Sequence, residues 1–90
     1  MDDRSVLMKL VRLAMRTLTL AKTMHSLGYS NNPYYDIHGE IADTIYEMLG
    51  EHTNEFSKSI TNLVLSSDII TDDQRVDILS HHYRKNHAIV

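Results

Sequence analysis

The 90-residue chain contains no cysteine and no tryptophan, and it has one proline and three glycines. Without cysteine it forms no disulfide, no thiolate metal site and no cysteine nucleophile, and this composition is typical of a reducing compartment. We therefore expect a cytoplasmic protein. Long apolar runs are also missing, because Lys9, Arg12 and Arg16 interrupt the first apolar segment. We expect neither a signal peptide nor a membrane span.

Motifs for catalysis are equally scarce. Three glycines leave no Gly-rich phosphate loop, and no Gly-x-Ser-x-Gly elbow occurs. The six histidines do not pair at the i, i+3 or i, i+4 spacing of zinc ligands on a helix; they are His25, His38, His52, His81, His82 and His87. We therefore expect no enzyme activity, no metal and no cofactor. His82 is a candidate for a side chain whose charge changes between pH 5 and 8 and modulates self-association.

The apolar residues that are present recur with helical periodicity. They predict four helices over about residues 4–27, 36–50, 54–66 and 71–86, and no segment alternates as a strand does. A chain of this length sustains one hydrophobic core, so we expect a single domain over residues 1–90. Short connections favour antiparallel neighbours. The prediction is an all-α, four-helix bundle-like domain with a long central N-terminal helix.

The first helix has an unusually broad apolar surface. At about 100° per residue its apolar side chains cover roughly 200°, which is wider than the stripe of an ordinary surface helix. These side chains are Val6, Leu7, Leu10, Val11, Leu13, Ala14, Leu18, Leu20, Ala21, Met24 and Leu27. Such a helix needs cover on two sides. We therefore predict a homodimer that forms through this helix.

Local sequence signals predict where each helix begins and ends, and apolar spacing predicts which side of it is buried. The expected caps are Gly28 and Gly50 after the first two helices, Asp36 and Thr53 or Asn54 before the second and third, and a Thr71–Gln74 capping box for the fourth. The expected buried stripes are Phe56, Ile60, Leu63 and Val64 in the third helix, and Val76, Leu79 and Tyr83 in the fourth. Ile69 and Ile70 are expected to turn inward between them.

Charge is divided along the chain. Residues 1–27 and 74–90 carry net charges of +3 and +2, whereas residues 28–73 hold nine acids against Lys58. The acids of the predicted second helix share one side of it; they are Glu40, Asp43, Glu47 and Glu51. Two interpretations stay open. Basic outer helices can offset the acidic middle, or the acidic side can face a basic partner and steer its approach.

The loop that precedes these acids is rich in tyrosine. Tyr29, Tyr34 and Tyr35 surround the single proline, and tyrosine is enriched at protein interfaces. One interpretation is that Tyr34 or Tyr35 folds back to close the bundle. The other is a partner-binding surface made of Tyr29, Tyr34, Tyr35, Glu40, Asp43 and Glu47. Our main hypothesis is a small cytoplasmic interaction protein, an adaptor or inhibitor of phage-encoded or regulatory type.

Two alternatives remain. A DNA-binding transcriptional regulator would use the basic side of the first helix, with Lys9, Arg12 and Arg16; a helix-turn-helix over residues 54–86 is disfavoured because Asp72 and Asp73 would meet phosphate. Secondly, Glu40-Ile41-Ala42-Asp43 resembles half of the paired carboxylate motif of all-helical nucleotide pyrophosphohydrolases, and this resemblance implies magnesium-dependent hydrolysis. The first helix lacks the acids that would complete the motif.

Overall fold

The computed structural model describes residues 3–50 and 55–87, and it describes side chains for residues 4–50 and 55–82. These residues form four α-helices and no strand: α1 (Asp3–Ser26), α2 (Pro33–Met48), α3 (Glu55–Ser66) and α4 (Asp72–His87). α1 packs against each of the other three helices. The predicted all-α, bundle-like fold around a long first helix is confirmed.

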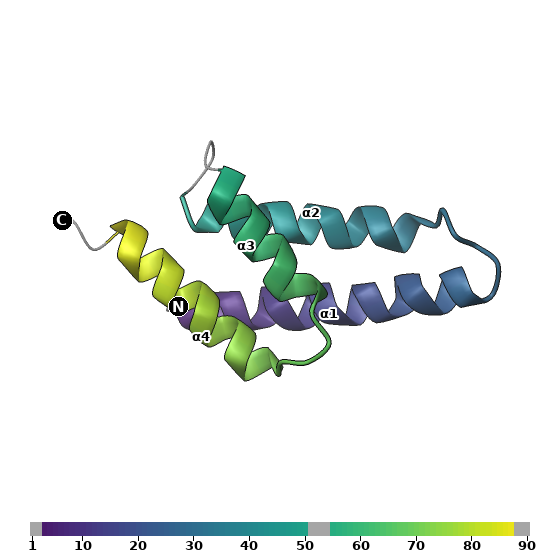
Figure 1. Ribbon diagram of the computed structural model, residues 1–90, viewed down its shortest axis with the longest axis horizontal. Helices are drawn as coiled ribbons and strands as arrows, with labels where there is room; N and C mark the ends of the chain where they lie inside the picture. Colours follow the sequence, from purple (N-terminus) through teal and green to yellow (C-terminus); the bar gives the residue numbers. More distant parts are fainter. Residues whose placement is uncertain (1–2, 51–54, 88–90) are drawn as a thin grey trace.

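The helices form two layers on a long, narrow molecule. α1 and α2 run antiparallel as a pair, and α3 and α4 cross in front of that pair near one end (Figure 1). The other end of the pair, with the α1–α2 turn, projects alone, and the molecule measures 49 × 25 × 24 Å. One side of the α1–α2 pair is therefore covered by α3 and α4 over part of its length.

The core lies between these two layers. Every helix contributes to it, and its buried apolar residues are Leu7, Val11, Ala14, Ile41, Ala42, Ile45, Leu49, Val64, Leu65, Val76 and Leu79. On α2 and its C-cap, Ile41, Ile45 and Leu49 are buried, whereas Ile37 is 42% exposed. The inner residues Val76 and Leu79 of α4 are also confirmed, and the side chain of Tyr83 lies outside the described ones.

The turn between α1 and α2 is held by two local motifs. Gly28, with a φ of 100°, ends α1 as predicted. The Gly28 N–H donates to His25 O at 3.0 Å and the Tyr29 N–H to Met24 O at 3.0 Å, the two bonds of a Schellman motif. Asn32 is 4% exposed, and its amide nitrogen donates to Ala21 O at 3.1 Å and to Tyr29 O at 2.8 Å.

The predicted start of the second helix is wrong by one turn. Asn32, not Asp36, is the N-cap, and its side-chain oxygen accepts from the Tyr34 N–H at 3.1 Å. Pro33 takes the first helical position, where its missing N–H costs nothing and its fixed φ is already helical. Tyr34 and Tyr35 consequently belong to the first turn of α2 and not to a loop. The predicted stop at Gly50 agrees with its φ of 76°.

The buried side of α3 agrees with the prediction at Ile60 and Val64 but differs at the other two positions. Phe56 and Leu63 are 72% and 69% exposed, and the buried residues are Ser57, Thr61, Val64 and Leu65. Burial of the two hydroxyls is inexpensive because both are bonded: Thr61 Oγ1 donates to Ser57 O at 3.0 Å, and Ser57 Oγ lies 2.7 Å from His82 Nε2 on α4. The expected caps Thr53 and Asn54 lie outside the described residues.

A buried arginine joins α3 to α4. Arg75 is 5% exposed; its Nε donates to Val64 O at 3.1 Å, and its two terminal nitrogens reach Asp72 Oδ1, at 2.8 Å, and Ser67 O. The connection before α4 turns Ile70 towards the core but leaves Ile69 91% exposed, so the inward placement predicted for both is wrong for Ile69. The Thr71–Gln74 capping box is confirmed by its two reciprocal bonds.

Candidate functional site

A row of carboxylates runs along α2, and we call it the acidic ridge: Asp36, Glu40, Asp43 and Glu47. All four side chains are exposed, and none makes an ion pair within the described part of the chain. They lie on the side of α2 opposite Ile45, which is fully buried. Glu51, the last acid of the predicted row, lies outside the described residues. The ridge spans about 16 Å at 1.5 Å per residue.

The three tyrosines lie at the turn end of the α1–α2 pair, before the acidic ridge. Tyr29 is 61% exposed, and Tyr34 and Tyr35 are half-buried. Tyr35 Oη lies 3.4 Å from His25 Nδ1 on α1, and the two rings meet edge to face at a centroid distance of 6.1 Å. The structure thus groups Glu40, Asp43 and Glu47 on one exposed side and ties Tyr35 to α1 at the helix start.

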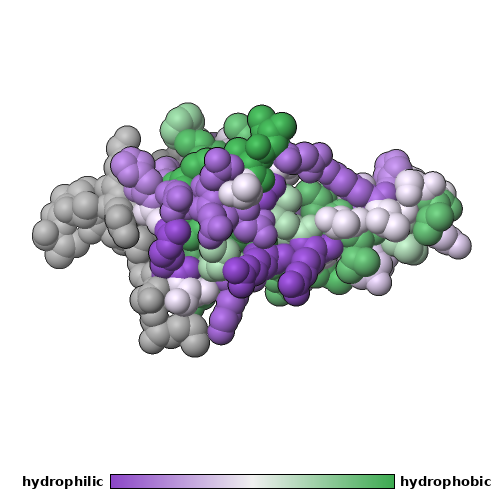
Figure 2. All heavy atoms as spheres, turned by 90° about the horizontal axis from the view of Figure 1, so that it is seen from below, coloured by the Kyte–Doolittle hydropathy of each residue, from purple (hydrophilic) through white to green (hydrophobic). Residues whose placement is uncertain are grey.

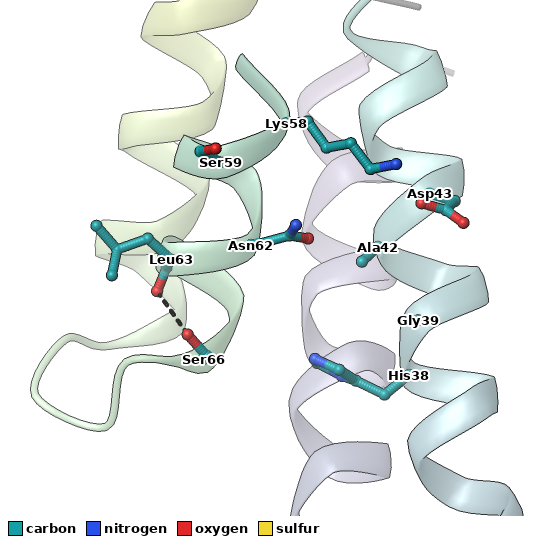
Figure 3. Close-up of a pocket in the computed structure, with 9 residues that line it drawn as sticks. All are labelled: His38, Gly39, Ala42, Asp43, Lys58, Ser59, Asn62, Leu63 and Ser66. Atoms are coloured by element: carbon teal, nitrogen blue, oxygen red, sulfur yellow. Dashed lines mark hydrogen bonds between the residues drawn. The ribbon is translucent and has the colours of Figure 1, made fainter. Parts of the chain in front are cut away.

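An open groove of about 660 Å³ separates α2 from α3 (Figure 3). Its α2 wall includes two small residues, Gly39 and Ala42, and Lys58 reaches across from α3 towards α2 close to Asp43. The Lys58 Nζ lies 6.0 Å from the centroid of the Tyr46 ring. His38 also lines the groove, but its Nδ1 bonds to Ala14 O on α1 at 2.8 Å. The groove can accommodate an apolar or hydroxyl-bearing side chain.

The outer edge of α1 carries three exposed cations, which we call the basic edge: Lys9, Arg12 and Arg16. Within the described part of the chain they make no ion pair, whereas Arg4 pairs with Asp77 at 2.7 Å and Lys22 with Asp68 at 3.4 Å. The α1–α2 pair therefore has a basic edge on one helix and the acidic ridge on the other, and the two point away from each other.

A third surface is apolar and lies on the side of the α1–α2 pair opposite α3 and α4. Arg4 and Lys22 are five full turns apart and both bond towards the α3–α4 layer, and Leu20 lies about 160° around the helix from them. On α2, Tyr46 marks the side that faces α3, because Lys58 of α3 lies over its ring. Ile37 is two and a half turns from Tyr46 and therefore lies on the opposite side of α2. We call this surface the back face: Val6, Leu13, Leu20, Met24, Leu27 and Ile37.

The back face is substantially open to solvent. Leu13, Leu20 and Leu27 are 52%, 49% and 67% exposed, and they recur every seven residues. Seen from below, green hydrophobic residues lie along the projecting end of the α1–α2 pair (Figure 2). The broad apolar surface predicted for the first helix is therefore only partly covered within the chain. The heptad spacing of the leucines was visible in the sequence, whereas the contribution of Ile37 was not.

Two arrangements contain residue types that can catalyse reactions or bind metals: Ser57 with His82, and Glu40 with Asp43. The pair formed by Ser57 and His82 resembles a nucleophile with its base, but Ser57 has no exposed surface for a substrate to reach. It joins α3 to α4. Among the residues described, no three histidine, aspartate or glutamate side chains converge as metal ligands. Glu40 and Asp43 point outward from α2, away from the cationic first helix.

Comparison with known proteins adds no relative: no family model, curated protein or solved structure matches this chain. Within residues 3–50 and 55–87, no helix is both long and apolar enough to cross a lipid bilayer.

Proposed function

We propose that this protein is a small protein–protein interaction module of the cytoplasm, an adaptor or inhibitor that acts by binding a partner and not by catalysis. The acidic ridge is the surface that carries the proposal. Asp36, Glu40, Asp43 and Glu47 form an unbroken exposed row without ion pairs in the described part of the chain. Such a row attracts a basic protein surface, accelerates encounter and disfavours acidic competitors.

The tyrosines extend this proposal to the turn end of α2. Tyr29 offers an exposed ring with a polar tip, and Tyr34 and Tyr35 are held in place by the Asn32 cap and the contact with His25. Rigid aromatic side chains contribute contact area at low entropic cost. We assign a supporting role to these three residues beside the carboxylates.

The test removes the charge of the ridge without disturbing the helix. Neutralisation with Glu40→Gln, Asp43→Asn and Glu47→Gln removes three negative charges and so raises the net charge by three. A control with Thr19→Lys, Thr23→Lys and Ser26→Lys raises the net charge by the same amount on an exposed side of α1. We expect the ridge variant, and not the control, to lose partner capture from the native source, and we expect wild-type capture to weaken as salt rises. Equal capture of the partner by both variants would show that the carboxylates of the acidic ridge do not bind it.

Nucleic acid is the second candidate ligand, because the basic edge is exposed and without ion pairs in the described residues. Lys9, Arg12 and Arg16 would make phosphate contacts whose affinity falls steeply with salt. However, Leu13 and Leu20 lie between and beyond these cations, and apolar side chains of this size suit a protein surface better than phosphate. A gel shift at low salt that disappears in the Arg12→Ala, Arg16→Ala variant would favour DNA binding instead.

A further inference from the structure

We propose that the partner of the acidic ridge is a second copy of the same chain, docked through the back face. This inference rests on the proposed function and names the partner. Leu13, Leu20 and Leu27 are about half exposed or more, and Ile37 is 42% exposed on the neighbouring helix. Thr44, on the same side of α2, is also exposed, and its hydroxyl is already bonded within the helix, since Thr44 Oγ1 donates to Glu40 O at 2.9 Å.

The back face is close in size to one side of a standard dimer interface. α1 and α2 contain 24 and 16 residues, which corresponds to lengths of about 36 and 24 Å at 1.5 Å per residue. Two packed helices are about 20 Å wide, so the face measures roughly 500–700 Å² before side-chain relief is added. A standard interface buries about 800 Å² on each partner. Two α1–α2 pairs packed face to face thus make a four-helix arrangement of ordinary dimensions.

The charged edges select one symmetric arrangement. In a twofold dimer whose axis runs parallel to the helices, α1 of each copy packs against α2 of the other, so each basic edge meets an acidic ridge. With the axis perpendicular to the helices, α1 would pack on α1 and like charges would meet. The first arrangement is therefore favoured by electrostatic complementarity.

The register of the α1–α2 pair brings these charges to the same level. His38 bonds to Ala14 O and Asn32 bonds to Ala21 O. Because α1 and α2 are antiparallel, a residue of α1 and a residue of α2 lie at the same level along the pair when their sequence numbers add up to about 52. A twofold axis along the helices preserves these levels between copies. The opposed pairs in the dimer are Lys9 with Asp43, Arg12 with Glu40, and Arg16 with Asp36.

Sedimentation velocity between 1 and 100 μM, in 50 and 500 mM NaCl, tests the back face. We expect wild-type protein to sediment at twice the chain mass of 10.4 kDa and to dissociate more readily at high salt. Leu13→Gln with Leu20→Gln should give a monomer. Leu63→Gln on the opposite side, where the leucine is 69% exposed, should remain a dimer. Circular dichroism at 222 nm confirms that each variant is folded.

Charge-swapped variants test the arrangement. Arg12→Glu with Arg16→Glu, and separately Asp36→Lys with Glu40→Lys, should each raise the dimer Kd at least about tenfold, because like charges then face each other. An equimolar mixture of the two variants should restore the dimer, since both edges of the mixed species are complementary. Because the chain has no cysteine, an equimolar mixture of two otherwise wild-type proteins, one with Arg12→Cys and the other with Glu40→Cys, should also cross-link across the dimer.

Each outcome supports or overturns the inference. A wild-type monomer at 100 μM overturns the second-copy proposal, while ridge-dependent capture of a different protein would leave the proposed function standing. A dimer that is unaffected by Arg12→Glu and Arg16→Glu overturns the α1–α2 arrangement, because in the perpendicular arrangement this variant only exchanges one like-charge pairing for another. A dimer that persists in the Leu13→Gln, Leu20→Gln variant would show that the back face is not the dimer interface.

Discussion

Replacement of Arg75 by lysine should strongly destabilise the protein although charge and stem length are nearly kept. The guanidinium donates from three nitrogens, to Val64 O, Asp72 Oδ1 and Ser67 O, at a site that is 5% exposed. A lysine has one terminal nitrogen in place of this fork and leaves at least the buried Val64 carbonyl or the ion pair unsatisfied. Hydrogen bonds from charged donors contribute about 1.5–3 kcal/mol each, so we expect a loss of about 3 kcal/mol.

Arg4→Lys is the matched control for this substitution. Arg4 also pairs with an aspartate of α4, Asp77 at 2.7 Å, but its side chain is 47% exposed and the pair is solvated. Its replacement should cost less than about 1 kcal/mol. Urea unfolding monitored by circular dichroism, at one fixed protein concentration, measures both. With a slope near 1 kcal/mol per molar urea, Arg75→Lys should lower the midpoint by about 2–3 M. Midpoints for the two variants within about 0.5 M of each other would refute the reasoning.

The effects of four further substitutions are predicted from local geometry. Gly28→Ala should destabilise by about 1–2 kcal/mol because φ is +100° there, although no atom obstructs a Cβ; Gly39→Ala, in the interior of α2 with equal space, should stabilise by up to about 1 kcal/mol. The two melting temperatures should move in opposite directions. Asn32→Asp should cost about 2 kcal/mol in urea unfolding although aspartate caps helices as well as asparagine, because it cannot donate to Ala21 O or Tyr29 O; a neutral effect would contradict this. Ile45→Ala, at a fully buried site, should cost 2–5 kcal/mol, and a smaller loss would show that the core relaxes around the cavity.

The features that the sequence predicts well are those with local causes. Gly28 and the Thr71–Gln74 capping box depend on a few neighbouring residues, and both occur as expected. The start of α2 also had a local signal, since an asparagine before a proline at the first helical position is a common helix start. Asp36 competed with it because either residue is a good N-cap.

The features that the sequence does not reveal depend on what packs beside each helix. The spacing of Phe56 and Leu63 predicts a buried stripe, but α3 instead buries Ser57 and Thr61, whose hydroxyls have partners. Similarly, the acidic row on α2 was visible as a pattern, whereas the back face depends on which side of the α1–α2 pair receives α3 and α4. Periodicity identifies apolar surfaces and does not say which of them the chain itself covers.

The closed turn at Asn32 has a consequence for the order of folding. Every bond of its side chain joins residues no more than 11 positions apart, so the reversal of the chain can form before distant segments meet. During synthesis from the N-terminus, α1 and α2 leave the ribosome first. Until α3 and α4 follow, this nascent hairpin exposes apolar side chains on two opposite sides. The chain's own C-terminal half later covers only one of these two sides.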